Sequence, residues 1–159
     1  MYLNRKWKSI LTWVLLTEAV GGLAGWLTRA GTAYISQFAR KPALTPPAAV
    51  FPAVWAVLYA LMGVGAGLVA VSPAGAGRTA ALRSFCVQLG VNFLWSLVFF
   101  NLRAYGPAFL TLTVLWGLIV WMTLTFRGLD RTAALLQIPY LLWVFFAGYL
   151  NFGVWMLNR

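Results

Sequence analysis

Three stretches of the chain carry aromatic and amide side chains at three- and four-residue spacings, which places the members of each stretch on one face of a helix. The nine candidate residues are Trp55, Tyr59, Gln88, Asn92, Trp95, Tyr140, Trp143, Ala147 and Asn151. Indole and phenol rings can stack on a flat aromatic ligand, and amide groups can orient its polar edge. These residue types therefore suit a ligand pocket with aromatic walls and a few polar anchors.

The same residues also have a purely structural explanation. Amide side chains such as Gln88, Asn92 and Asn151 cost free energy in an apolar environment unless they are hydrogen-bonded. Hydrogen bonds between helices would satisfy them, and tryptophan and tyrosine can fill a bundle core or anchor a helix at a membrane surface. The residue pattern alone leaves both explanations open.

Residues for the common enzymatic chemistries are scarce. The chain has no histidine, two acidic residues and a single cysteine, Cys86. The usual ligand of a metal or haem iron and the commonest general base are therefore missing, and no glycine-rich phosphate loop is present. We predict no catalytic residue of these kinds, no metal site and no required cofactor. Any activity would have to work through the aromatic side chains or a bound ligand.

Glu18 is the one acidic residue inside an apolar run. A carboxyl group within a membrane span is a functional candidate, so a proton-coupled small-molecule exporter built around Glu18 is one hypothesis. The structural alternative is a protonated or backbone-bonded glutamate that holds its helix against the neighbouring helices. We favour this second interpretation.

The elements that must position these residues follow from composition. Hydrophobic residues make up 62% of the 159 residues, charged residues only 9%, and the mean hydropathy is +0.83. A soluble domain has about a quarter charged residues, so the bilayer must be the solvent for most of this surface. Because about 20 apolar residues in a helix cross the hydrocarbon core, we predict helices over 9–27, 48–71, 80–102, 105–126 and 132–157. The chain is predicted to be an all-α, multi-pass integral membrane protein, a single domain forming a five-transmembrane-helix bundle.

The connections between these runs are short, with one exception. Residues 28–46 form a long, proline-containing connection, which suggests a lid over one end of the bundle. Asp130 is well placed to cap the start of the fifth helix. Gly63 and Gly67 form a GxxxG pair that permits close helix approach.

Twelve basic residues give a net charge of +10, but they lie in the gaps between apolar runs. This spacing is typical of anchors that meet membrane lipid phosphates, and it excludes nucleic acid as a partner. Seven of the twelve fall on the side of the N-terminus (Arg5, Lys6, Lys8, Arg78, Arg83, Arg127 and Arg131) and five on the other (Arg29, Arg40, Lys41, Arg103 and Arg159). The positive-inside rule then favours a cytoplasmic N-terminus.

Three motifs, in order along the chain, resemble those of the TspO/MBR family, the tryptophan-rich sensory proteins related to the mitochondrial translocator protein (peripheral benzodiazepine receptor). The first joins Lys41-Pro42 and Pro46-Pro47 to Phe51-Pro52-Ala53-Val54-Trp55, the second is Gln88-Leu89 with Asn92 and Trp95, and the third is Ile138-Pro139-Tyr140-Leu141-Leu142-Trp143 with Ala147 and Asn151. The resemblance covers nearly the whole chain.

The resemblance implies a five-helix bundle, often a homodimer, that binds porphyrins such as protoporphyrin IX and benzodiazepine-type ligands in tetrapyrrole handling or stress signalling. Its pocket positions match Trp55, Asn92, Tyr140, Trp143 and Ala147, with the first long loop as a cover. The resemblance also implies an alternative activity, the light- and oxygen-dependent breakdown of porphyrin through Trp55 and Trp143.

Two loop positions depart from the family pattern. Ala33 and Leu44 stand where the family usually has tryptophan, so two rings that could stack on a ligand are missing. The sterol-recognition pattern also fails, because the first basic residue after Tyr149 is Arg159. We therefore do not predict cholesterol binding.

Overall fold

A computed structural model describes residues 2–159 of the chain, and the fold is all-α. Its elements are α1 (Tyr2–Phe38), α2 (Val50–Ala70), α3 (Ala76–Ser96), the π-helix η1 (Leu97–Asn101), α4 (Tyr105–Arg127), α5 (Arg131–Leu135) and α6 (Ile138–Leu157). Five helical segments within the described residues are long and apolar enough to cross a membrane: Asn4–Phe38, Val50–Ala70, Ala76–Asn101, Tyr105–Arg127 and Arg131–Leu157. The predicted multi-pass, five-helix class is confirmed.

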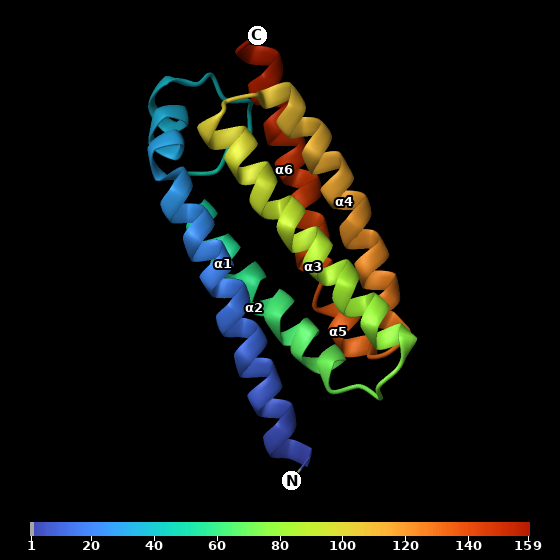
Figure 1. Cartoon of the computed structure of the whole chain (residues 1–159). Helices are drawn as coiled ribbons and strands as arrows, with labels where there is room; N and C mark the ends of the chain where they lie inside the picture. The colour runs from blue at the N-terminus through green and yellow to red at the C-terminus, as the bar shows by residue number, and fades with distance from the viewer. Residues whose placement is uncertain (1) are drawn as a thin grey trace.

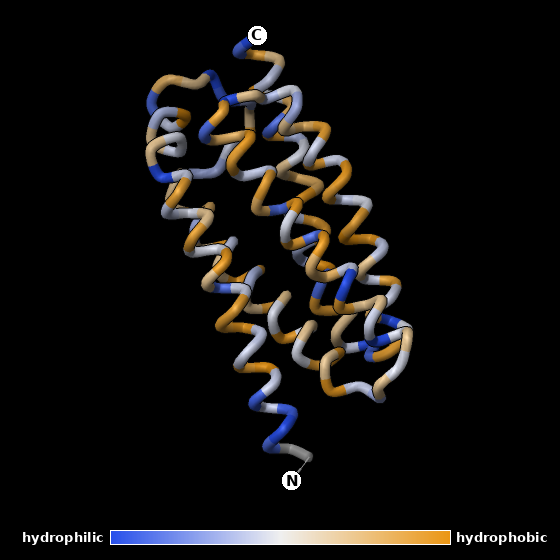
Figure 2. Tube along the Cα trace, viewed as in Figure 1, coloured by the Kyte–Doolittle hydropathy of each residue, from blue (hydrophilic) through white to orange (hydrophobic). Residues whose placement is uncertain are grey.

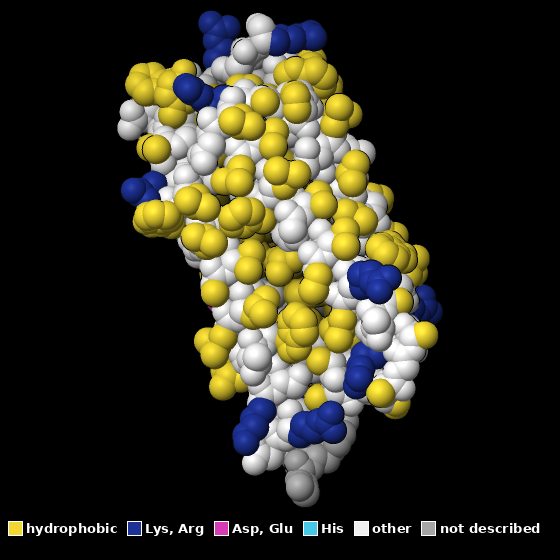
Figure 3. Space-filling model, in the orientation of Figure 1, with side chains coloured by type: hydrophobic (Ala, Val, Ile, Leu, Met, Phe, Trp, Pro, Cys, Tyr) yellow, Lys and Arg dark blue, Asp and Glu magenta, His cyan; other side chains and the backbone are white. Residues whose placement is uncertain are grey.

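The long helices run side by side and alternate in direction, so the two termini lie at opposite ends of the bundle (Figure 1). Packing is closest between α1 and α2, between α3 and α4, and between α4 and α6, whereas α2 and α6 make few direct contacts. Hydrophobic residues recur along every long helix, and the most hydrophilic stretches lie at the ends of the bundle (Figure 2). On the face seen in Figure 3, Lys and Arg side chains gather mainly towards the two ends, with a hydrophobic surface between them. This distribution suits a bilayer as the solvent.

The first helix is longer than we predicted. Residues 28–38, expected to be loop, continue α1 to Phe38. Hydropathy marks where the chain leaves the hydrocarbon, but nothing there forces the helix to end, since the first proline is Pro42. The side chain of Thr28 donates to the carbonyl of Ala24 and is buried. The loop that connects α1 to α2, here called loop one, is therefore only residues 39–49.

The fifth span is broken where we predicted one continuous helix over 132–157. The chain forms α5, a break at Leu136 and Gln137, and then α6. Pro139 is the physical reason, because it has no N–H for the carbonyl of Leu135 and its ring crowds that carbonyl. The predicted cap is confirmed, since Asp130 Oδ1 accepts a 2.8 Å hydrogen bond from the backbone N–H of Ala133.

The third span ends in a π-helix, which the sequence pattern did not predict. The amide of Leu102 donates to the carbonyl of Leu97 over 3.1 Å, a five-residue step that widens the last turn. Arg103 then adopts a left-handed backbone with φ of 53°, and α4 begins two residues later. This turn brings η1 against α1, where Gly31 lies directly on the carbonyl of Phe100.

The GxxxG pair of α2 faces α1 within the same chain. A Cβ atom on Gly63 would lie 2.5 Å from the Cα of Val14, and one on Gly67 would lie 2.5 Å from the Cα of Ile10. The close approach lets Ser9 Oγ donate to the carbonyl of Gly67 over 3.0 Å. The predicted close helix approach is therefore confirmed, with α1 as the partner helix.

Candidate ligand-binding site

The polar candidates of α2, α3 and α6 form one chain of hydrogen bonds across the bundle. Tyr59 donates its hydroxyl to Asn92 Oδ1 (3.2 Å), Asn92 Nδ2 donates to the Tyr140 hydroxyl (2.6 Å), and that hydroxyl donates to Gln88 Oε1 (2.9 Å). The amide of Gln88 completes the chain with a long, weak contact to the sulfur of Met62 at 3.8 Å. We call the four residues Tyr59, Asn92, Tyr140 and Gln88 the polar ladder.

A second polar pair lies towards the end of the bundle that carries the C-terminus. Trp95 donates its indole N–H to Asn151 Oδ1 over 3.1 Å, and Asn151 Nδ2 donates to the backbone carbonyl of Tyr105. This pair joins α3, α4 and α6. Both side chains are buried.

Trp55 packs against three of the other aromatic candidates. Its ring centre lies 5.7 Å from that of Tyr59, 6.1 Å from that of Trp95 and 6.2 Å from that of Tyr140. These are normal separations for tilted and edge-to-face aromatic pairs. Trp55 is half-buried, so one side of this cluster approaches the surface of the bundle.

The structure thus gathers most of the predicted residues into a tightly packed interior. Tyr140 and Gln88 are completely inaccessible, and Asn92 and Asn151 are each 1% exposed. Each of these polar groups has a partner in the protein, which supports the structural explanation of the amides. A ligand could contact this set only by displacing bonds that are already made.

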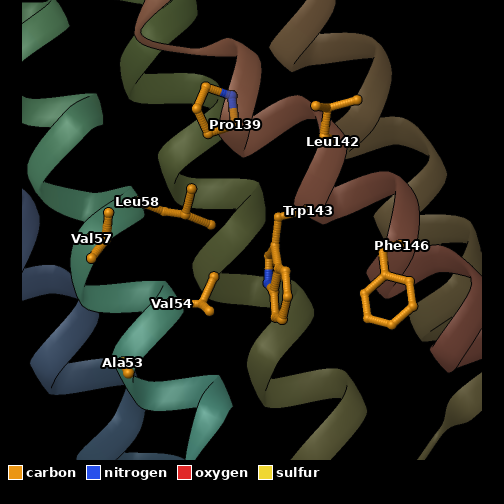
Figure 4. A pocket seen from close by; sticks show the side chains of 8 residues that line it. All are labelled: Ala53, Val54, Val57, Leu58, Pro139, Leu142, Trp143 and Phe146. Atoms are coloured by element: carbon orange, nitrogen blue, oxygen red, sulfur yellow. The ribbon is translucent and has the colours of Figure 1, made fainter. Parts of the chain in front are cut away.

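An open cavity lies beside this interior, in the gap between α2 and α6. It is an apolar groove of about 550 Å³ lined by Ala53, Val54, Val57, Leu58, Pro139, Leu142, Trp143 and Phe146. Figure 4 shows side chains from both helices facing this space, with the indole of Trp143 standing between Val54 and Phe146. Trp143 is the one predicted site residue on this lining, and we call the cavity the α2–α6 groove.

Trp143 carries an unsatisfied donor. Among the side chains of residues 4–159, the buried polar atoms without a hydrogen-bond partner are Trp143 Nε1 and Gln137 Oε1. A buried N–H without a partner costs free energy comparable to a lost hydrogen bond. The edge of the indole that bears the nitrogen is turned towards α2 (Figure 4).

The remaining lining residues were not among the predicted site residues. Pro139, Trp143 and Phe146 follow i, i+4, i+7 spacing, so they form an apolar and aromatic stripe on α6 that the helical period could have revealed. On α2, Val54 and Leu58 are ordinary aliphatic residues of a membrane helix. Nothing in their type distinguishes a groove wall from a lipid-facing surface.

Loop one is held against α6 and against Asn158, the residue that follows α6. The side chain of Asn158 bonds both the N–H and the carbonyl of Arg40, and the Tyr149 hydroxyl donates to the carbonyl of Ala43. Gly153 leaves room for the ring of Pro42, since a Cβ there would lie 2.5 Å from the proline Cβ. Loop one therefore packs against the end of α6, and it contributes no residue to the lining of the groove.

Glu18 lies outside both the polar ladder and the groove. It is half-exposed on α1, between Thr17, whose hydroxyl donates to the carbonyl of Tyr59, and Gly21, which lies on the Tyr59 ring. The α2–α6 groove has no wall from α1. The exporter hypothesis gains no support from this position.

Comparison with known proteins identifies relatives along nearly the whole chain. The model of the TspO/MBR family matches residues 13–156. Protein CrtK of Rhodobacter capsulatus is 35% identical over 141 residues, which are 88% of this chain and 87% of that protein. The tryptophan-rich protein TspO of Chlorobaculum tepidum is 34% identical over 157 residues, 95% of this chain and 98% of that protein. The human translocator protein is 35% identical over 122 residues, 76% and 72% of the two chains.

Proposed function

The chain belongs to the TspO/MBR family, and we propose that it is a membrane receptor that binds porphyrins and similar flat aromatic molecules in the α2–α6 groove. Similarity to proteins named translocator protein and tryptophan-rich sensory protein supports the receptor or sensor class. The ligand class rests on the groove and on Trp143. We further propose that the bound tetrapyrrole is handled or sensed by the protein, with benzodiazepine-type molecules as alternative occupants of the same groove.

The main support for this proposal is an apolar groove that has the unsatisfied indole donor of Trp143 on its wall. Small-molecule sites are commonly concave and mostly apolar, occupy about 300–1,000 Å³, and place a few polar groups to orient the ligand. Trp143 and Phe146 supply ring faces for stacking, while Val54 and Leu58 form an aliphatic wall. Because the groove opens at the surface of membrane-spanning helices, an apolar ligand would enter from the lipid.

The test is a titration of protoporphyrin IX into the purified protein, followed by tryptophan fluorescence. We expect saturable quenching in the wild type and a loss of about tenfold in affinity for Trp143→Ala, which removes both stacking and the donor. Trp143→Phe keeps a ring but lacks the N–H, so we expect a smaller loss of about fivefold. Trp121→Phe, on the exposed face of α4, is the matched control and should bind normally. Absence of saturable quenching, or equal affinity in wild type and Trp143→Ala, would refute the proposal.

Photochemical breakdown of the bound porphyrin is a second candidate, favoured by one observation. Of the two tryptophans named for it, Trp143 lies on the groove wall, where its ring could contact an excited porphyrin, whereas Trp55 lies behind the wall against Tyr59 and Trp95. Illuminating the complex in air and following the Soret band tests this activity. Loss no faster than for free porphyrin would eliminate it without affecting the binding proposal.

A further inference from the structure

A second recess lies at the end of the bundle that carries the C-terminus, away from the α2–α6 groove. It has a volume of about 560 Å³ and lies between the end of α1, the turn from η1 to α4, and the end of α6. Six of its lining residues define its chemistry: Tyr34, Phe38, Arg40, Arg103, Tyr105 and Arg159. Three arginines therefore line one recess together with three aromatic residues.

These arginines have no acidic side chain nearby to neutralise them. The chain contains two acidic side chains, Glu18 and Asp130. Asp130 caps α5 at the opposite end of the bundle. Glu18 lies half-way along α1 beside Tyr59, more than five helical turns from Phe38. Like charges that line one recess repel one another, and an anion in the recess would relieve that repulsion.

The backbone around two of the arginines is held in place. Arg40 is fixed through both its N–H and its carbonyl by the side chain of Asn158, at 2.9 and 2.8 Å. Arg103 adopts the left-handed conformation that favours glycine, and its guanidinium carbon lies 4.4 Å from the centre of the Tyr34 ring. A cation–π contact orients the guanidinium without satisfying its hydrogen-bond donors. The donors remain free to bind oxygen atoms.

The type of anion follows from the donors and from the position of the recess. Guanidinium groups match phosphate oxygens in bidentate fashion. The recess lies where the membrane-spanning segments end, and its aromatic wall continues outwards to Phe38, which is 67% exposed. An exposed ring of this kind at the end of a span is suited to the interface between headgroups and acyl chains. The neighbouring surface is therefore apolar, whereas the recess itself is lined by arginines.

We propose that this recess binds the phosphate headgroup of one anionic membrane phospholipid, with Arg40 and Arg103 as its principal ligands and the aromatic wall against the glycerol and the first acyl carbons. The site is separate from the α2–α6 groove and from the proposed porphyrin binding. It differs from general attraction between basic loops and the membrane, since it requires two particular arginines held in a single recess.

The experiment uses the whole protein, stripped of lipid in an uncharged detergent. Short-chain phosphatidylglycerol, phosphatidylcholine with the same chains, and inorganic phosphate are titrated separately, and bound lipid is quantified by native mass spectrometry. We expect phosphatidylglycerol to bind at least tenfold more tightly than the other two probes. The double variant Arg40→Gln/Arg103→Gln should lose about 25-fold in that affinity, or about fivefold for each arginine removed.

The matched control is Arg127→Gln/Arg131→Gln, which removes the same charge from two exposed arginines at the opposite end of the bundle. It should bind phosphatidylglycerol within about twofold of the wild type if binding depends on the recess rather than on net charge. Arg103→Lys keeps the charge but loses the planar fork, and should bind with intermediate affinity. Equal losses in the two double variants, equal binding of both lipids, or inorganic phosphate binding as tightly as phosphatidylglycerol would each overturn the proposal.

Discussion

Tyr140 occupies the centre of the polar ladder, because its hydroxyl both accepts from Asn92 and donates to Gln88. A phenol can serve in this way because its oxygen is a donor and an acceptor at once. The three side chains satisfy one another in an interior that is closed to the surface. Their mutual hydrogen bonds explain why amides are tolerated inside these membrane-spanning helices.

Replacing Tyr140 with phenylalanine tests the ladder. The change keeps the ring but leaves Asn92 Nδ2 and Gln88 Oε1 without these partners, so we expect a loss of about 1–2 kcal/mol in stability. Thermal unfolding in detergent measures it. Tyr149→Phe is the control, because it removes one hydroxyl bond at an exposed position and should cost less. An unchanged unfolding temperature for Tyr140→Phe would contradict the ladder.

The sequence indicated which side chains would lie on the inner faces of the helices. It did not indicate whether they would bind a ligand or form hydrogen bonds with one another. The helical period correctly placed Gln88, Asn92 and Trp95 on an inner face of α3. Residue type cannot distinguish an amide that waits for a ligand from one that bonds a neighbouring helix, because that depends on where the partner helix lies. The groove was missed for a related reason, since aliphatic residues such as Val54 and Leu58 carry no functional signal.

At the scale of the elements, the contact between α1 and α2 is the closest in the bundle. It depends on Gly63, Gly67 and Gly21, beside which the backbone of α1 or the ring of Tyr59 leaves no room for a side chain. Such small residues allow helix backbones in a membrane to approach and gain dispersion energy. The contact also fixes the position of α2, and therefore of one wall of the groove.

Substituting Gly63 by alanine should separate these two helices. The new Cβ would lie 2.5 Å from a backbone atom of Val14, which cannot move without shifting α1, so we expect a loss of about 1–3 kcal/mol in stability. Gly22→Ala is the matched control, since nothing lies within 4 Å of its Cβ position, and it should be neutral or slightly stabilising. Equal unfolding temperatures for the two variants would show that the contact is less tight than described.

The ends of the helices were predicted well where they coincide with the ends of apolar runs. They were predicted poorly where a helix continues beyond its apolar run or where a proline interrupts it. Hydropathy located α2 and α4 almost to the residue, since their ends coincide with the ends of apolar runs. It missed the extension of α1 to Phe38, because a helix can continue beyond the hydrocarbon without a signal in hydropathy. It also missed the break before α6, although Pro139 is a local signal that could have indicated it.

In the whole molecule, the helices surround a filled interior, and the α2–α6 groove lies open beside it. The aromatic and polar residues of α2, α3 and α6 fill the centre, and the α2–α6 groove lies where two helices make few direct contacts. Because α1 already covers Gly63 and Gly67, a homodimer of the kind the family resemblance implies would have to use another face. The α2–α6 groove opens towards lipid, so a ligand bound in it need not disturb the packed interior.

The distribution of basic residues predicts the orientation in the membrane. Seven of the twelve flank the end that carries the N-terminus, so the turn between α2 and α3 should be cytoplasmic and loop one should lie on the opposite side. In a Cys86→Ser background, an impermeant maleimide added to intact cells should label Ala43→Cys but not Gly75→Cys. The reverse labelling pattern would refute this orientation.

Filling the α2–α6 groove with a larger side chain tests whether porphyrin binds there, and the quantity to measure is the affinity for protoporphyrin IX. Val57 lines the groove and is 59% exposed, so Val57→Trp should occupy the space while leaving the polar ladder untouched. We predict that Val57→Trp weakens binding by about tenfold or more, roughly 1.4 kcal/mol. Val87→Trp, on the exposed face of α3, should bind as the wild type does. Undiminished binding by Val57→Trp would show that the ligand binds elsewhere and would contradict the account.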